Sequence, residues 1–273
     1  MSAKLLLGKP VVESIANKVL AYSARNAIGK LCAVGFDEPR WNQYSSSLAK
    51  SADRYGVICE NIVVANDCSP AELSETLKRI SERADVGGII LQQPLPKTYV
   101  NVVNAIDVNK DVDCLNPLSV CRLYNGEAGF RPATPQAVLN LLDYYNIDLQ
   151  GKNVVILGRG SAVGKPLALM ALQRNATVTV CHTKTVDLPS VCRNADIIIS
   201  ACGVAGLVTN DFVTDKSIVI DVGLSFVNGV TSGDVSKEVY DKCAAVSPVP
   251  GGVGPVTRAT LFYNLLLASK GMQ

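Results

Sequence analysis

The sequence has no block of like charges, because 26 Lys and Arg against 24 Asp and Glu leave a formal net charge of +2. This balance argues against a nucleic-acid partner, since such proteins carry clustered basic surface. No apolar stretch reaches the ~18 uninterrupted residues of a membrane span, and the run Leu5–Leu7 is too short for the core of a signal peptide. We therefore expect a cytoplasmic protein that binds a small molecule and neither nucleic acid nor membrane.

Histidine is scarce, with one residue in 273, and the nine cysteines contain no Cys-x-x-Cys pair. Zinc sites and disulfide frameworks need such pairs or an even, regularly spaced set. We expect reduced core thiols and no metal site. Hydrophobic residues make up 48% of the chain, which suits a protein that folds around its own core. Its length allows one large domain or two of ordinary size.

Strand-like and helix-like segments alternate along the whole chain, which is typical of an α/β fold with mostly parallel strands. In the first part, Ser69, Pro70 and Glu72 form a helix start with a capping box. The expected strands there are Leu31–Phe36, Gly56–Val64 and Val86–Leu91, and the expected helices are Tyr44–Tyr55 and Pro70–Arg83. The prolines Pro94 and Pro96 then end the third strand.

A second series of elements follows a loop expected over Asp113–Pro132. Its repeat is that of strand–helix–strand crossovers, so we expect a doubly wound parallel sheet of the Rossmann type. The expected strands are Asn153–Leu157, Ala176–Cys181, Asp196–Ala201 and Ser217–Val222, and the expected helices are Pro135–Tyr145 and Gly164–Arg174. The domain boundary is expected near residues 116–132.

A glycine-rich turn joins the expected strand Asn153–Leu157 to the helix that begins at Gly164. Its spacing, G-x-G-x-x-x-G, is a variant of the dinucleotide fingerprint, in which glycines allow close approach of a pyrophosphate to a helix N-terminus. The alternative is a glycine-rich turn without a ligand. The candidate cofactor residues in this turn are Gly158, Arg159, Gly160, Ser161, Val163 and Gly164.

The end of the next strand favours NADP over NAD. An NAD site usually carries Asp or Glu there to hold the ribose 2′-hydroxyl. This chain has Cys181, His182 and Thr183 instead, and no carboxylate until Asp187. A guanidinium such as Arg159 pairs well with a 2′-phosphate. His182 and Thr183 are therefore further cofactor candidates, although His182 could equally pack or cap the strand end.

Several segments, in order along the chain, resemble the methylenetetrahydrofolate dehydrogenase/cyclohydrolase family. They are Gln92–Pro96, Lys110–Asp113, Pro132–Pro135, Gly158–Pro166, Asn175–His182, Asp221–Gly223, Gly233–Val235 and Pro248–Pro255. The resemblance implies a homodimer of two-domain subunits, with folate bound in a cleft between the domains. It also implies that residues 1–120, with the C-terminal helix in residues 257–273, form the catalytic folate-binding domain, and residues 121–256 the NADP-binding domain.

The resemblance also assigns folate-site residues. The tyrosine that stacks on the pterin falls on Tyr44, the glutamine on Gln92 and the aspartate that hydrogen-bonds the pterin ring on Asp113. These three are the candidate catalytic residues. A carboxylate can accept the paired N–H groups of an aminopterin edge, although each residue could instead be an ordinary solvated loop residue. Further substrate contacts are implied at Pro250, Gly251 and Gly252.

One departure from the family pattern affects the chemistry. The family has Tyr-x-x-x-Lys, but this chain has Leu48 four residues after Tyr44. Lys50 lies six residues after Tyr44, which at about 100° per residue turns it roughly 120° away. Hydride transfer to NADP needs mainly alignment, whereas hydrolysis of the methenyl product needs proton transfer. We expect oxidation of 5,10-methylenetetrahydrofolate in one-carbon metabolism, with weak or absent cyclohydrolase.

Three alternatives stay open at this point. The enzyme could be fully bifunctional and produce 10-formyltetrahydrofolate, with Lys50 or another group reaching the site through a distorted helix. The chain could be a non-catalytic folate- or nucleotide-binding homologue, although an idle site has no need for so many glycines with special backbone conformations. It could also be a dehydrogenase for an unrelated small substrate.

Overall fold

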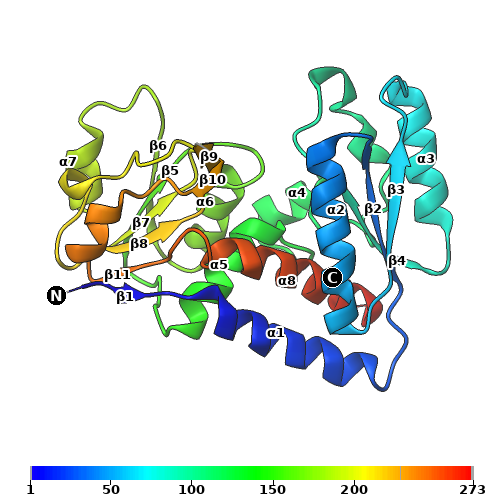
Figure 1. Cartoon of the computed structure of the whole chain (residues 1–273), viewed down its shortest axis with the longest axis horizontal. Helices are drawn as coiled ribbons and strands as arrows, with labels where there is room; N and C mark the ends of the chain where they lie inside the picture. Colours follow the sequence, from blue (N-terminus) through cyan, green and yellow to red (C-terminus); the bar gives the residue numbers. More distant parts are fainter. Residues whose placement is uncertain (1, 228, 272–273) are drawn as a thin grey trace. The chain divides into compact units, whose positions relative to one another are not determined.

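A computed structural model describes residues 2–227 and 229–271 of the chain (Figure 1). The chain divides into two compact units. The six-stranded unit comprises Met1–Glu13 and Thr134–Thr257, and the three-stranded unit comprises Ser14–Ala133 and Arg258–Gln273. Each is built on a parallel sheet, so the expected α/β class is confirmed.

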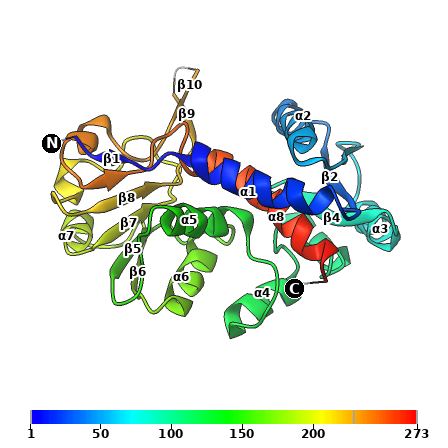
Figure 2. The same cartoon turned by 90° about the horizontal axis from the view of Figure 1, so that it is seen from below.

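The six-stranded sheet has the order β1-β11-β8-β7-β5-β6, and all its pairings are parallel (Figures 1 and 2). Its central strands are continuous apolar runs because a parallel sheet of this kind is covered on both faces. Four of the strands lie where the sequence pattern predicts them. The strands are β1 (Lys4–Leu5), β5 (Asn153–Leu157), β6 (Thr177–Cys181), β7 (Ile197–Ser200), β8 (Ile218–Asp221) and β11 (Ala245–Val246).

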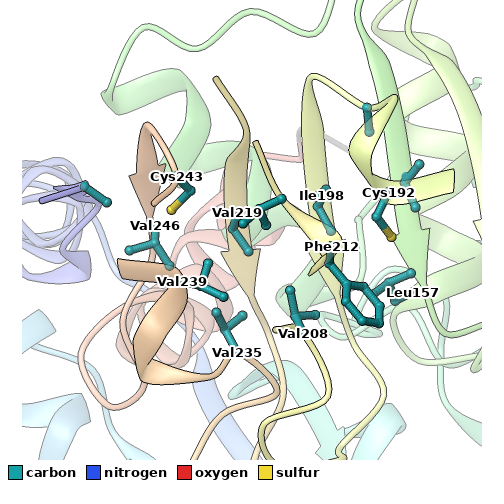
Figure 3. Close-up of a cluster of buried hydrophobic side chains, with 14 of the residues drawn as sticks. Leu157, Cys192, Ile198, Val208, Phe212, Val219, Val235, Val239, Cys243 and Val246 are labelled. Atoms are coloured by element: carbon teal, nitrogen blue, oxygen red, sulfur yellow. The ribbon is translucent and has the colours of Figure 1, made fainter. Parts of the chain in front are cut away.

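Helices and a hairpin complete this unit. They are α5 (Ala133–Tyr144), α6 (Gly164–Gln173), α7 (Leu188–Arg193), two short 3-10 helices (Asn210–Phe212 and Lys237–Asp241) and the hairpin β9 (Ser225–Val227) and β10 (Val230–Ser232). A buried cluster fills the space beside the sheet, and Figure 3 shows Phe212 beside Leu157 within it. Ile198 and Val219, from neighbouring strands, are fully buried in the same cluster.

The three-stranded sheet has the order β3-β2-β4, with β2 (Lys30–Phe36), β3 (Cys59–Val64) and β4 (Val86–Leu91). Its helices are α1 (Gly8–Ser23), α2 (Pro39–Ala52), α3 (Pro70–Glu82), α4 (Pro117–Asn125) and α8 (Val253–Ser269), with 3-10 turns at Asp53–Tyr55, Lys97–Tyr99 and Val102–Ala105. Helix α8 runs alongside α1, where the Tyr22 hydroxyl donates to the carbonyl of Ser269 at 3.3 Å (Figure 2). The capping box is confirmed, since Glu72 accepts from the Ser69 amide at 2.7 Å and the Glu72 amide donates to the Ser69 hydroxyl.

The structure differs from the sequence-based expectations at several boundaries. Strand β1 pairs with β11, so the first 13 residues belong to the six-stranded unit and not with residues 14–120. The change of unit falls at 133/134. Helix α4 lies in the segment expected to be a loop, because Asn116 caps it and Gly126 ends it in a left-handed conformation.

Three further element boundaries move. Helix α2 begins at Pro39, a residue whose fixed φ suits the first helical turn, and ends at Ala52. Strand β3 begins at Cys59, since Gly56 has φ +62° and ends the preceding turn. Helix α8 begins at Val253, four residues before the expected start.

Within residues 2–227 and 229–271, no helix is both long and apolar enough to cross a membrane. The same residues contain no group of three or more His, Cys, Asp or Glu side chains suited to hold a metal ion.

Candidate active site

The glycine-rich turn after β5 is built for close backbone contact. Gly158 has φ +105°, and a Cβ there would lie 2.5 Å from the carbonyl oxygen of Ala201. A Cβ on Gly164 would collide with the carbonyl oxygen of Gly158. Helix α6 starts at Gly164, so its free amides and its dipole make the turn a site for an anion. Ser161 and Arg159 are exposed at this turn.

The end of β6 lies next to the same turn, because the Gly158 amide donates to the carbonyl of Cys181 at 2.9 Å. His182 Nδ1 accepts from the Lys184 amide at 3.1 Å, so part of its imidazole caps the turn, as the alternative interpretation of this residue expects. Asp187, the first carboxylate after β6, caps α7 by accepting from Ser190. A ribose hydroxyl therefore has no acidic partner in residues 182–186 of the sequence, which suits a 2′-phosphate.

Sequence reasoning gave no role to Asp234, which orders the loop after β7. The side chain is fully buried, and one carboxylate oxygen accepts from Ser200 Oγ at 2.8 Å and from the amides of Cys202 at 2.7 Å and Gly203 at 3.2 Å. The other oxygen accepts from the amide of Val204 at 2.7 Å. Hydrogen bonds to an ionised acceptor are the strong ones. This loop directly follows Ala201, whose carbonyl faces Gly158, so Asp234 shapes the wall of the cofactor turn.

Asp221 binds the backbone around Asp234. Its carboxylate accepts from the amides of Gly223 at 2.9 Å, Asp234 at 3.0 Å and Val235 at 2.9 Å. Burial raises the pKa of Asp221 to about 6, against the effect of those amides. The signal for both residues was present in the matched segments Asp221–Gly223 and Gly233–Val235, but the pattern did not say what they bind.

The segment Pro248–Pro255 makes a tight turn at one end of the six-stranded sheet. Gly251 has φ +106° and its carbonyl accepts from the Gly8 amide at 2.8 Å. The Gly252 amide donates to the Pro248 carbonyl at 2.7 Å. Pro250 lines a cavity of about 380 Å³. The three predicted substrate contacts, Pro250, Gly251 and Gly252, thus lie together on one turn of this unit.

The other candidate residues lie in the three-stranded unit. Tyr44 is on α2 and keeps 37% of its surface exposed, while Asp113 follows the buried residue Val112. Burial around the hydroxyl raises the pKa of Tyr44, the charge of Asp113 adds to this effect and Arg258 opposes it. Burial raises the pKa of Asp113 to about 6, although its carboxylate accepts from the Ala133 amide at 3.1 Å. The structure therefore brings Tyr44 and Asp113 within electrostatic reach of each other.

Gln92, directly after β4, has both ends of its amide engaged. Its Oε1 accepts from the Phe36 amide at 2.7 Å, and its Nε2 donates to Glu38 Oε2 at 2.7 Å. Glu38 precedes the first residue of α2. Sequence reasoning missed Glu38, because the two residues are far apart in the chain.

The face of α2 that carries Tyr44 lacks the family lysine. Leu48 is fully buried, in a stripe with Trp41, Ser45 and Ala52. Lys50 lies outside this stripe and is exposed. A cation reaches the helix from elsewhere: Arg258 Nη1, on α8, donates to Ser47 Oγ at 2.9 Å. A guanidinium stays protonated at any ordinary pH, so it can attract an anion but cannot exchange a proton as a lysine can.

Comparison with known proteins places these features in one family. The model of the tetrahydrofolate dehydrogenase/cyclohydrolase catalytic domain matches residues 6–113, and the model of its NAD(P)-binding domain matches residues 132–273. The bifunctional protein FolD of Clostridium perfringens strain 13 is 41% identical over 270 residues, covering 96% of this chain and 98% of the relative.

Solved structures agree. The bifunctional enzyme FolD of Campylobacter jejuni has a TM-score of 0.94 at 36% identity and covers 100% of both chains. The Trypanosoma brucei methylenetetrahydrofolate dehydrogenase-cyclohydrolase, complexed with NADP and an inhibitor, has a TM-score of 0.90 at 31% identity, with 99% of this chain and 98% of that chain covered. The resemblance predicted from the sequence is confirmed, and this chain belongs to the tetrahydrofolate dehydrogenase/cyclohydrolase family.

Proposed function

We propose that this protein is an NADP-dependent methylenetetrahydrofolate dehydrogenase. The observation that carries the proposal is the retention of Tyr44, Gln92 and Asp113 in the three-stranded unit, with Tyr44 and Asp113 electrostatically coupled. The activities of the related solved enzymes support the reaction, and the NADP in the Trypanosoma brucei structure supports the cofactor. On this proposal the three-stranded unit is the catalytic folate-binding part and the six-stranded unit the NADP-binding part.

The residues at the glycine turn fit a bound dinucleotide, which would accept the hydride removed from the methylene carbon. Gly158 and Gly164 let the turn pack tightly against the backbone of Ala201 and of the turn itself, and the free amides at the start of α6 are available to a phosphate. Arg159 suits the 2′-phosphate. Gly160, Ser161, Val163, His182 and Thr183 complete the proposed set.

At the folate end, each residue has one task. The Asp113 carboxylate accepts the paired N–H groups of the pterin edge, and the Tyr44 ring stacks on the pterin. Gln92 donates from its amide. Pro250, Gly251 and Gly252 are proposed as substrate contacts on their own turn. Tyr44, Gln92 and Asp113 hold the pterin that bears the methylene carbon, and alignment of that carbon is the main requirement of hydride loss.

We further propose that the cyclohydrolase is weak or absent. Leu48 has no group that can move a proton, and the guanidinium of Arg258, which donates to the neighbouring Ser47, has no acceptor atom for one. The competing candidate is a fully bifunctional enzyme, which is favoured by the similarity to the bifunctional FolD proteins of Clostridium perfringens and Campylobacter jejuni. The two candidates differ only in the fate of the methenyl product.

The test is a time course of the purified protein with 5,10-methylenetetrahydrofolate and NADP that follows NADPH and methenyltetrahydrofolate separately. NADPH should rise in step with methenyltetrahydrofolate, which should disappear no faster than without enzyme. Rapid conversion into 10-formyltetrahydrofolate would establish the bifunctional candidate. If neither NADPH nor, with NAD supplied, NADH is formed, the protein is a non-catalytic folate- or nucleotide-binding homologue.

Two finer proposals concern assembly and location. We propose a homodimer, supported by β3, an edge strand on which Val63 is 51% exposed, with the neighbouring Ile58 63% exposed. Light scattering should give twice the chain mass, and Val63→Lys should shift it toward the monomer. We also propose a cytoplasmic location, supported by nine free cysteines, several of them in the core.

A further inference from the structure

The hydrogen bonds of the Gln92 side chain decide which way its amide faces. The oxygen and nitrogen of an amide are nearly alike in shape, so only their partners distinguish the two orientations. The Phe36 amide can only donate, and it faces Oε1 at 2.7 Å. The Glu38 carboxylate, when ionised, can only accept, and it faces Nε2 at 2.7 Å. Reversing the amide would place donor against donor and acceptor against acceptor.

Among the described residues, Glu38 is the acceptor for the Gln92 side-chain nitrogen, so one hydrogen of that nitrogen is available to a ligand. An amide nitrogen carries two hydrogens, and Glu38 takes one of them. The second is then held in a fixed direction, since the first is tied to a charged acceptor and the oxygen is tied to the backbone of β2.

The position of Glu38 at the start of α2 lets its carboxylate accept from Gln92. It precedes Pro39 in extended conformation, and in the described part of the chain its side chain makes no capping hydrogen bond to the helix. Its carboxylate points instead to the end of β4. Glu38 therefore ties the residue after β4 to the helix that carries Tyr44.

We propose that Glu38 is a positioning residue, which holds the Gln92 amide so that its remaining N–H donates to the folate. This inference rests on the proposed dehydrogenase function. The Glu38 carboxylate acts through Gln92 and not on the substrate itself.

The test is a double-mutant cycle with NADP-linked dehydrogenase activity as readout. Glu38→Leu removes the acceptor, Glu38→Gln keeps an acceptor oxygen without charge, and Gln92→Ala removes the amide. Glu82→Leu, an exposed acid on α3, is the matched control for loss of a surface carboxylate. Thermal unfolding of each variant shows whether it is folded.

Glu38→Leu should lower kcat/KM for folate by about 3- to 10-fold, the usual effect of one positioned hydrogen bond, with KM for NADP unchanged. Glu38→Gln should recover most of this loss. In the Gln92→Ala background Glu38→Leu should have no further effect, because its target is gone.

Equal losses from Glu38→Leu in both backgrounds would overturn the proposal, as would a failure of Glu38→Gln to recover activity while folded. The proposed function fails in a different way, through a wild-type protein that oxidises no methylenetetrahydrofolate. In that case the cycle is run on folate affinity by thermal shift with tetrahydrofolate as probe, and additive losses there would equally reject the role of Glu38.

Discussion

Replacing Leu48 with lysine restores the Tyr-x-x-x-Lys pattern on α2 and tests why the cyclohydrolase should be weak. Tyr44 and residue 48 lie on one side of the helix, one turn apart. The new side chain starts from a fully buried position and is adjacent in sequence to Ser47, to which Arg258 donates. Burial lowers the pKa of a lysine, and a nearby cation lowers it further. A fraction of the molecules would then carry this lysine unprotonated near neutral pH, able to accept a proton.

The same burial sets the expected loss of stability. Removing the buried leucine forfeits about 1.5–3 kcal/mol of transfer free energy, and ordering a lysine adds about 1.5–2 kcal/mol. The lysine stem refills part of the space, so a net loss of about 2–4 kcal/mol is expected. For a unit of this size that corresponds to a fall in Tm of roughly 8–16 °C.

The assay measures disappearance of methenyltetrahydrofolate with NADP absent, so that the dehydrogenase does not contribute. Leu48→Lys should hydrolyse the methenyl compound at least about 10-fold faster than the wild type, at the low end of general acid–base catalysis because the lysine is not evolved for its place. Leu48→Met is the matched control, since it keeps the volume and adds no ionisable group.

The reasoning about Leu48 is refuted by a Leu48→Lys protein that is folded and oxidises methylenetetrahydrofolate, yet hydrolyses the methenyl compound no faster than Leu48→Met. A wild-type protein that already hydrolyses it rapidly would refute it as well, because some other group would then supply the proton transfer.

Three other changes test the remaining parts of the site. Asp234→Asn places an NH2 group against backbone donors. The affinity for NADP, measured by fluorescence titration, should therefore fall by about 10-fold or more, while the affinity for tetrahydrofolate stays unchanged. An unaltered NADP affinity would contradict the role of the loop. Gly158→Ala brings a Cβ against Ala201 at a φ of +105°, whereas Gly160→Ala has open space around it. The Gly158 variant should therefore lose far more NADP affinity than the Gly160 variant. Similar losses in the same titration would argue against the close backbone approach. Because the pKa of Asp113 is raised to about 6, its carboxylate is protonated as pH falls through 6, so KM for folate should rise below that pH, and Asp113→Asn should remove this limb of the profile. The sign for stability is the reverse of the common acid case: a raised folded-state pKa contributes stability that is present below the unfolded value and is lost as pH rises through about 6.

Local sequence signals account for much of the fold. The apolar runs of β5 and β4 have the same ends in the sequence-based expectation and in the structure, because a buried parallel strand needs continuous apolar residues. The capping box at Ser69 gave the start of α3. The glycine spacing after β5 predicted a close backbone turn, and the collisions that a Cβ would make at Gly158 give the physical reason.

Helix α4 and the two shortest strands of the six-stranded sheet were not predicted from the sequence. Asn116, Pro117 and Gly126 are ordinary start and stop residues of a helix, yet α4 was expected to be a loop. The two-residue strands β1 and β11 have no periodicity to detect, since each is too short to alternate or to form an apolar run.

The sequence by itself determined the alternation of strands and helices, the glycine-rich turn after β5, and the presence of Tyr44, Gln92, Asp113 and Leu48 in the segments that resemble the family. Only the tertiary structure decided which partners these residues have. The Gln92 amide faces Glu38, the Ser47 hydroxyl faces Arg258, and Asp234 collects the amides after β7. Each of these hydrogen bonds joins residues at least 30 positions apart, and no local preference of the chain encodes a contact that forms only when distant segments pack together.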